Sequence, residues 1–257
     1  MQPTLNAINS GVNVALSNKE SLVMAGQIIK KALDRSESEL FPVDSEHSAI
    51  WQCLKDEDIN SIDSIALTAS GGSLRDIQYN ELSKITPSQV LNHPTWSMGD
   101  KITVDSATLI NKVFEVQEAS NLFEIPLDKI NVVFHNESII HGMVNYVDGN
   151  TISIMSKPDM KIPILYALFY PNRAKSKIVE RINFNKLKNL TFRDYDEKKL
   201  SFFNFGMNVI KSSKLGPSFL VGSDQAVVEN FLKNKINYLG MLDIMKEVYK
   251  YMDLSKP

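Results

Sequence analysis

The sequence is poor in cysteine and contains no long apolar segment. Cys53 is the only cysteine in 257 residues, so an internal disulfide is excluded and a reducing compartment is expected. No apolar run reaches the roughly 18 residues that a membrane helix needs, and the amino terminus lacks the charged-then-apolar pattern of a secretory signal. We therefore expect a cytoplasmic protein with no membrane partner, and we expect Cys53 to be packed inertly rather than to be reactive.

The sequence also lacks an excess of basic charge. Lysine and arginine number 28, aspartate and glutamate number 30, and the formal net charge is -2. Binding to nucleic acid depends on a strongly basic face, so no nucleic-acid partner is expected and any anionic ligand must be held locally. At 43% hydrophobic and 23% charged residues, the chain has the composition of a folded globular protein with one large or two modest cores.

The hydrophobic periodicity near the N-terminus predicts a parallel βαβ unit. Residues 3–8 are typical of an amphipathic helix, and residues 12–16 and 40–43 are typical of strands. The helix between these strands is predicted to open with a capping box from Ser17 to Glu20. Parallel strands joined in this way bind ligands at their carboxyl ends. Because nothing precedes this unit to complete the sheet, the chain is expected to begin inside a domain.

The rest of the chain predicts a mixed α+β region followed by helices. We expect a strand at 62–68, a loop or lid at 86–100, and a helix at 106–123 with Asp105 as its N-cap. Residues 139–147 and 151–155 are predicted to form a hairpin through Asp148-Gly149. A polar stretch without periodicity follows at 174–199, and helices are expected at 225–232 and 238–251. The expected fold class is α/β and α+β. It comprises a remnant of a Rossmann-like parallel sheet at 1–43, a mixed α+β catalytic domain with a lid loop at 44–179, a connector at 180–205 and a small, shortened C-terminal helical domain at 206–257.

Three carboxylates are candidate ligands for a hard divalent cation, which prefers oxygen donors. Asp44 and Glu46 directly follow a predicted strand. The predicted helix adds a polar arc made of Thr108, Asn111, Lys112 and Glu115. Acidic pairs after strands are also common as helix caps or solvated turns, and such an arc is also typical of a solvated helix face with a Lys–Glu pair. The pattern alone leaves both interpretations open.

Two further segments have the composition to hold an anion or to cover a site. Ser70-Gly71-Gly72 follows a strand and could cradle a phosphate with backbone N–H groups, although Gly-Gly taken in isolation is more often an ordinary turn. Residues 93–99 combine a histidine with a tryptophan and a methionine, as in a lid that excludes water, or as in a surface loop that packs its tryptophan onto the core. His47, His135 and His141 lack metal-ligand spacing and are predicted to form structural hydrogen bonds.

Taken together, these segments resemble the 1-deoxy-D-xylulose 5-phosphate reductoisomerase family. The matching blocks are Asn18-Lys19-Glu20-Ser21, residues 42–47, Ser70-Gly71-Gly72, residues 93–99, residues 105–108 with Asn111-Lys112, and Pro158-Asp159-Met160. They follow the family's order and spacing over nearly the whole chain. The chain departs from the family's usual residues at Ser73-Leu74, Asp100, Val113, Asn136-Glu137 and Gly222-Ser223-Asp224. None of these departures removes a metal or phosphate position.

The resemblance implies a site and a reaction. It implies a Mg²⁺ or Mn²⁺ site made of Asp44, Glu46 and Glu115, with Lys19, Glu46 and Glu115 as catalytic residues. It implies substrate contacts from Ser45, Ser70, His93, Trp96, Ser106, Asn111 and Lys112. It implies contacts to NADPH from Asn18, Met98 and Met160. The implied enzyme is a homodimer that rearranges a phosphorylated sugar, 1-deoxy-D-xylulose 5-phosphate, and reduces it with NADPH to 2-C-methyl-D-erythritol 4-phosphate.

The family's glycine-rich dinucleotide-binding turn does not occur in this sequence. We therefore expect this polypeptide to bind metal and substrate phosphate far better than NADPH, and to show little activity unless the missing domain is supplied. Two other interpretations stay open. One is a related oxidoreductase that acts on another sugar phosphate, and the other is a catalytically silent remnant that serves as an oligomerisation or binding module.

Overall fold

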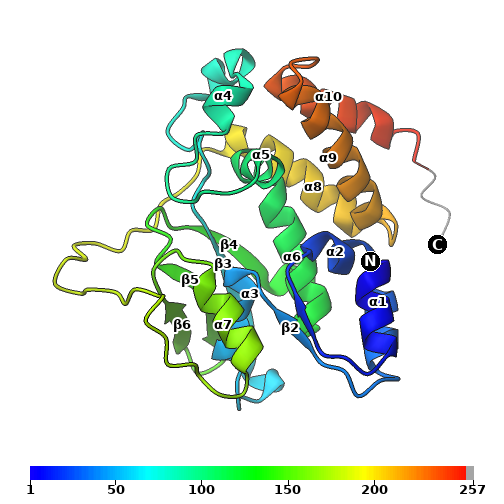
Figure 1. The fold of residues 1–257 in the computed structure, drawn as a ribbon. Coiled ribbons are helices and arrows are strands. Elements are labelled where there is room, and N and C mark those ends of the chain that lie inside the picture. Colours follow the sequence, from blue (N-terminus) through cyan, green and yellow to red (C-terminus); the bar gives the residue numbers. More distant parts are fainter. Residues whose placement is uncertain (253–257) are drawn as a thin grey trace. The chain divides into compact units, whose positions relative to one another are not determined.

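The computed structural model describes residues 1–252 (Figure 1). The chain divides into two compact units. Unit 1 combines Met1–Ala69 with Glu118–Arg193, and unit 2 combines Ser70–Gln117 with the described residues from Asp194 onward. Each unit is thus built from two separate stretches of chain. The domain boundaries expected from the sequence stay predictions, and residues 253–257 of the expected C-terminal domain lie outside the described residues.

Unit 1 begins with the predicted parallel βαβ arrangement. Its elements are α1 (Gln2–Asn9), β1 (Val14–Leu16), α2 (Lys19–Leu33) and β2 (Leu40–Pro42), and the two strands pair in parallel. Ile8, Leu16, Leu22 and Ile29 form the buried core between these elements. The prediction of a capping box from Ser17 is wrong. The N-cap of α2 is Asn18, whose side chain accepts the N–H of Ser21 at 3.2 Å and so satisfies a donor of the first turn.

The second part of unit 1 is a four-stranded sheet in the order β4-β3-β5-β6 (Figure 1). The strands are β3 (Ile62–Ala69), β4 (Ile130–Phe134), β5 (Ile140–Tyr146) and β6 (Thr151–Met155). β3 runs parallel to β4 and antiparallel to β5, and β5 and β6 form the predicted hairpin. The strand at 62–68 and the hairpin are confirmed. β4 was missed, although its Ile-Asn-Val-Val-Phe sequence has the β-branched and aromatic composition of a strand.

Helix α3 (Ser45–Cys53) packs against β5 and β6 of this sheet. The close approach depends on Gly142 in β5, because a Cβ atom there would lie only 3.1 Å from the carbonyl oxygen of Glu46 and 3.0 Å from Ile50. The sheet therefore fixes the first turn of α3, which carries the candidate site residues. Unit 1 also contains α7 (Lys161–Phe169) and the single-turn helices η1 (Ile59–Ser61) and η3 (Leu127–Lys129).

Unit 2 is helical over the part of it that the structure describes. Its elements are η2 (Tyr79–Lys84), α4 (Pro87–Val90), α5 (Asp100–Thr108), the first half of α6 (Ile110–Phe123), η4 (Glu197–Leu200), α8 (Ser201–Ser212), α9 (Gly216–Leu232) and α10 (Tyr238–Tyr249). α9 packs against α5, α8 and α10, and the hydroxyl of Tyr238 donates to the carbonyl of Ala107 at 3.0 Å. The helices predicted at 225–232 and 238–251 are confirmed. α8 begins at Ser201, inside the expected connector.

The prediction of one helix at 106–123 capped by Asp105 is wrong. α5 begins at Asp100 after Gly99 and ends at Thr108. The next residue, Leu109, has a left-handed φ of 66°, and α6 begins at Ile110. The hydroxyl of Thr108 accepts the N–H of Ile110 at 3.3 Å, so a side chain satisfies the donor that the break would otherwise leave. The apolar periodicity continues through this break, which is why the pattern predicts one helix.

The prediction of a loop over 86–100 is right only in part. Residues 87–90 form α4, with a capping box at Thr86, and α5 already begins at Asp100, so the loop proper spans 91–99. Within residues 1–252, we find no helix with the length and apolar character needed to cross a bilayer.

Candidate active site

In unit 1, the candidate residues lie at the carboxyl ends of the parallel strands β1 and β2. Asp44 occupies the N-cap position of α3, but its side chain makes no capping hydrogen bond and forms an ion pair with Lys19 instead. Ser45 donates to the carboxylate of Glu46 at 2.6 Å. The helix-cap alternative therefore does not account for the Asp44 side chain. Two carboxylates and a buried ammonium group converge where open α/β sheets bind ligands.

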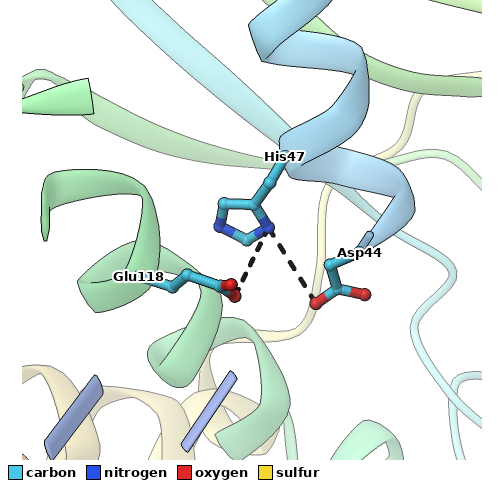
Figure 2. Close-up of side chains that lie close together, drawn as sticks. All are labelled: Asp44, His47 and Glu118. Atoms are coloured by element: carbon cyan, nitrogen blue, oxygen red, sulfur yellow. Dashed lines mark ion pairs between the residues drawn. The ribbon is translucent and has the colours of Figure 1, made fainter. Parts of the chain in front are cut away.

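A second cluster shares Asp44 and surrounds His47 (Figure 2). His47 is fully buried on α3, and its Nδ1 lies 3.5 Å from Oε2 of Glu118 and 3.9 Å from Oδ2 of Asp44. Figure 2 shows the ring between the two carboxylates, one at the start of α3 and one on α6. Both distances are longer than an ordinary hydrogen bond. One nitrogen and two carboxylate oxygens make up a ligand set that can bind a divalent cation. Glu118 was not predicted from the sequence, although it follows Glu115 by one helical turn.

In unit 2, the predicted polar arc is buried. Asn111 donates to one oxygen of Glu115 at 2.5 Å, and the Lys112 ammonium group donates to the other at 2.6 Å. Glu115 is 1% exposed and Lys112 is 7% exposed, so the alternative of a solvated face is wrong, although the Lys–Glu pair that it included is present. A buried carboxylate with two donors is held in one orientation, as a metal ligand requires.

Three of the candidate phosphate-binding residues in unit 2, Ser70, His93 and Ser106, lie at or beside the double glycine. Gly71 and Gly72 have φ values of 82° and 68°, and the turn packs against the backbone of Ser106 in α5. The hydroxyl of Ser70 lies 3.2 Å from Nε2 of His93. Burial, followed by the positive charges of Arg75 and Lys112, lowers the pKa of His93 to about 4. Positive charge around hydroxyl and N–H donors suits an anion.

Replacing Gly72 with alanine tests how closely this turn approaches the backbone of Ser106. A Cβ at Gly72 would lie 2.6 Å from the carbonyl oxygen of Ser106, and the φ of 68° is itself unfavourable for alanine. We expect Gly72→Ala to lower the free energy of unfolding by about 2 to 3 kcal/mol. Urea unfolding measures this loss. The matched control is Gly149→Ala, with a φ of 89° and open space around its Cβ, which should lose only about 1 kcal/mol. Equal losses would contradict the close approach of the turn to Ser106.

The remaining predicted residues are distributed over both units. In unit 2, Trp96 donates its backbone N–H to His93 at 2.9 Å, and Met98 lies in the same loop. In unit 1, Met160 is the N-cap residue of α7, and Asn18 caps α2.

A buried charge cluster beside Ser106 was also not predicted from the sequence. The Lys101 ammonium group lies 2.5 Å from a carboxylate oxygen of Asp105 and 2.7 Å from one of Asp224. Burial, followed by the neighbouring charge of Asp224, raises the pKa of Asp105 well above its ordinary value, although Lys101 opposes this. Burial lowers the pKa of Lys101, but the two carboxylates outweigh it and raise that pKa overall. The cluster joins α5 to α9 and so positions the helix that carries Ser106.

Comparisons with known proteins show to which family this chain belongs. Two family models described as C-terminal domains of 1-deoxy-D-xylulose 5-phosphate reductoisomerase match residues 40–123 and 155–257, and a third model of the same enzyme matches residues 1–26. A reductoisomerase of Clostridium novyi (strain NT) is 44% identical over 245 residues, which are 95% of this chain and 63% of that protein. The chain belongs to the 1-deoxy-D-xylulose 5-phosphate reductoisomerase family.

Solved structures of reductoisomerases agree with the fold. The Zymomonas mobilis reductoisomerase in complex with NADPH has a TM-score of 0.91 at 37% identity, covering 99% of this chain and 65% of that one. A reductoisomerase in complex with NADPH, fosmidomycin and magnesium has a TM-score of 0.90 at 37% identity, covering 95% of this chain and 62% of that one. The expected fold class is confirmed. The chain spans 62% to 65% of the length of these reductoisomerases.

Proposed function

We propose that this chain carries the metal and substrate sites of a 1-deoxy-D-xylulose 5-phosphate reductoisomerase, which makes 2-C-methyl-D-erythritol 4-phosphate for isoprenoid synthesis with NADPH and Mg²⁺ or Mn²⁺. The observation that carries the proposal is the match to a reductoisomerase bound to NADPH, fosmidomycin and magnesium, which extends over 95% of the chain. The buried polar residues described above also lie within the segments 1–26, 40–123 and 155–257 that the family models match. Both the fold and the chemistry of these residues therefore support one function.

The proposed metal ligands are Asp44, Glu46 and Glu115. All three supply carboxylate oxygens, which suit Mg²⁺ or Mn²⁺. Asp44 and Glu46 occupy the N-cap and the first turn of α3. Glu115 precedes Glu118 by one turn on α6, so the two side chains project from the same helix face, and Glu118 lies beside His47 in the first turn of α3.

The proposed substrate site uses the residues around the double glycine. We propose that Ser70, Ser106, Asn111, Lys112 and His93 bind the phosphate, and that Ser45 contacts the oxygenated carbon chain. Lys19 moves protons at the substrate's oxygens, because its ammonium group is buried next to Asp44. Trp96 and Met98 exclude water over the substrate. Asn18 and Met160 contact the NADPH. When bound, the cation supplies Lewis-acid stabilisation of negative charge on the substrate's vicinal oxygens.

A titration of Mn²⁺ by calorimetry tests the proposal. In the presence of a mimic that joins a phosphonate to a hydroxamate, we expect Mn²⁺ and the mimic to strengthen each other's binding. Glu115→Gln should weaken Mn²⁺ binding by at least about 10-fold, since even indirect partners of a metal contribute 10- to 100-fold. The control is Glu247→Gln, since Glu247 also pairs with a lysine three residues away but is exposed. It should leave the affinity unchanged.

This titration, together with a turnover assay and a measurement of thermal stability, separates the alternatives. Binding of the mimic with Mn²⁺, but no turnover of 1-deoxy-D-xylulose 5-phosphate once NADPH binding is established, would favour a related oxidoreductase on another sugar phosphate. An affinity for Mn²⁺ and a thermal stability in Mn²⁺ that Glu115→Gln leaves unchanged would favour the silent binding module.

We also propose that the protein is a cytoplasmic homodimer. The single cysteine supports a reducing compartment. The last part of unit 1 exposes several large apolar side chains, as interfaces do: Leu168, Phe169, Ile178, Phe184 and Phe192. Light scattering coupled to gel filtration would detect the dimer.

A further inference from the structure

The ammonium group of Lys199 binds three backbone carbonyl groups in the segment that follows the double glycine. It donates to the carbonyl oxygens of Leu74 at 3.0 Å, Arg75 at 2.8 Å and Ile77 at 2.8 Å. An ammonium group has three N–H donors, so three carbonyl acceptors match its hydrogen-bonding capacity. Lys199 lies in η4, 122 to 125 residues later in the chain, and all of these residues belong to unit 2. Lys199 therefore fixes the backbone of residues 74–77 from outside that segment.

Arg75 and Tyr195 each donate to a carbonyl group of the double-glycine turn. The guanidinium group of Arg75 donates to the carbonyl of Ser70 at 3.2 Å. The hydroxyl of Tyr195 donates to the carbonyl of Gly71 at 3.4 Å. The Lys199 ammonium group lies 5.1 Å from the centroid of the Tyr195 ring, as in a cation–π contact. Lys199 thus contacts both of the residues that bind the turn: the backbone of Arg75 and the ring of Tyr195.

The direction of these carbonyl groups determines where the N–H groups of the turn point. In a trans peptide unit, the C=O and N–H bonds point in opposite directions. The carbonyls of Ser70 and Gly71 face the two donor side chains, so the N–H groups of Gly71 and Gly72 point away from those side chains. The N–H group of Gly72 lies 3.3 Å from the Ser70 hydroxyl, which itself lies 3.2 Å from Nε2 of His93. Successive N–H groups turned to one side form a concavity that binds anions.

We infer that Lys199 is a positioning residue of the phosphate site: it holds Arg75 and Tyr195, and so keeps the N–H groups of the double-glycine turn directed toward the anion. The inference rests on the proposed function, because it requires an oxyanion on the N–H side of the turn. Glycine adopts many backbone conformations, so the turn needs restraint from its surroundings. When that restraint is lost, a peptide unit can rotate its carbonyl oxygen toward the anion, which the oxygen repels.

Three substitutions test this role with inorganic phosphate as the probe. Lys199→Met removes the donors and keeps a side chain of similar shape, whereas Lys199→Arg keeps the positive charge and several donors. Lys198→Met is the matched control, because Lys198 is the exposed neighbour in the same single-turn helix. Nuclear magnetic resonance of the ¹⁵N-labelled chain measures the phosphate affinity. Urea unfolding of each variant establishes that the titrated chain is folded.

The expected results differ between the three variants. Lys199→Met should weaken phosphate binding by about 10-fold, and Lys199→Arg by no more than about 3-fold. Lys198→Met should leave the affinity unchanged. In Lys199→Met, the amide signals of Gly71 and Gly72 should shift before any phosphate is added, because the turn has lost its restraint.

A double-variant cycle separates positioning from a purely structural role. If Lys199 acts by holding Arg75, Lys199→Met should weaken phosphate binding by much less in an Arg75→Met background than in the unsubstituted chain. A full loss of about 10-fold in both backgrounds would overturn the inference, because Lys199 would then act independently of Arg75. A lysine that only stabilised the fold would lower the free energy of unfolding and leave the phosphate affinity of the folded chain unchanged.

Two further outcomes would overturn the inference, and they differ in what they imply for the proposed function. If phosphate binds to Lys199→Met as tightly as to Lys198→Met, the positioning role is wrong while the proposed phosphate site stands. If phosphate does not bind to the folded, unsubstituted chain, the proposed phosphate site fails, and the positioning role fails with it.

Discussion

Replacing Lys101 with methionine is expected to lower the free energy of unfolding by about 3 to 5 kcal/mol at pH 7.5, because it leaves two buried carboxylates side by side. Lys101 lies within 2.7 Å of both Asp105 and Asp224, and both aspartates are about 2% exposed. Methionine has a similar shape but cannot offset their charge. Urea unfolding measures the loss.

The pH dependence of this loss follows from the sign of the pKa shift. Burial and mutual repulsion already raise the pKa of Asp105, and removal of the lysine raises it further. A carboxyl group with a raised pKa binds more protons in the folded than in the unfolded chain, so its contribution to stability is present at low pH and lost as the pH rises through the folded-state pKa. The deficit of Lys101→Met should therefore shrink between pH 7.5 and pH 5.5.

Two further variants of the lysine cluster serve as controls. Lys250→Met removes an exposed lysine that pairs with Glu247, and it should change stability by no more than about 0.5 kcal/mol. Adding Asp224→Asn to Lys101→Met removes one of the two neighbouring carboxylate charges. The double variant should therefore recover part of the lost free energy of unfolding. A loss that stays the same at both pH values and in the double variant would show that lost packing, rather than buried charge, is responsible.

Replacing Asp44 with asparagine is expected to weaken Mn²⁺ binding by about 100-fold or more. The substitution keeps the shape of the side chain and removes the charge that the proposed cation requires, whereas loss of an indirect partner costs only 10- to 100-fold. Calorimetric titration measures the effect. Asp44 also pairs with Lys19, so the unfolding of the variant must be measured alongside.

Glu118→Gln discriminates between the two clusters that share Asp44. If Asp44, Glu46 and Glu115 bind the cation, Glu118 acts only through His47, and its substitution should weaken Mn²⁺ binding by no more than about 10-fold. If the cation instead binds between Asp44, His47 and Glu118, the loss should equal that of Asp44→Asn while Glu115→Gln has little effect. The second result would contradict the proposed ligand set.

Local patterns were sufficient to predict much of unit 1. The strands flanking α2 and the hairpin at Asp148-Gly149 depend on alternation and turn composition within about ten residues, which a sequence displays directly. The break at Leu109 could not be predicted, because it depends on a left-handed φ in a bulky residue and on a hydrogen bond to Thr108. Neither feature interrupts the apolar period of the helix.

The candidate site was predictable where its residues carry a motif. Asp44, Glu46 and the double glycine follow strands, and so their positions could be inferred from the fold class. Lys101 and Asp224 are 123 residues apart, and no pattern in either segment indicates that they pair.

Anomalous diffraction from crystals soaked in Mn²⁺ would test the central claim most directly. The proposal predicts one anomalous peak about 2.0 to 2.3 Å from carboxylate oxygens of Asp44, Glu46 and Glu115. A peak between Asp44, His47 and Glu118 without Glu46 or Glu115, or no bound ion in crystals of the active protein, would contradict it.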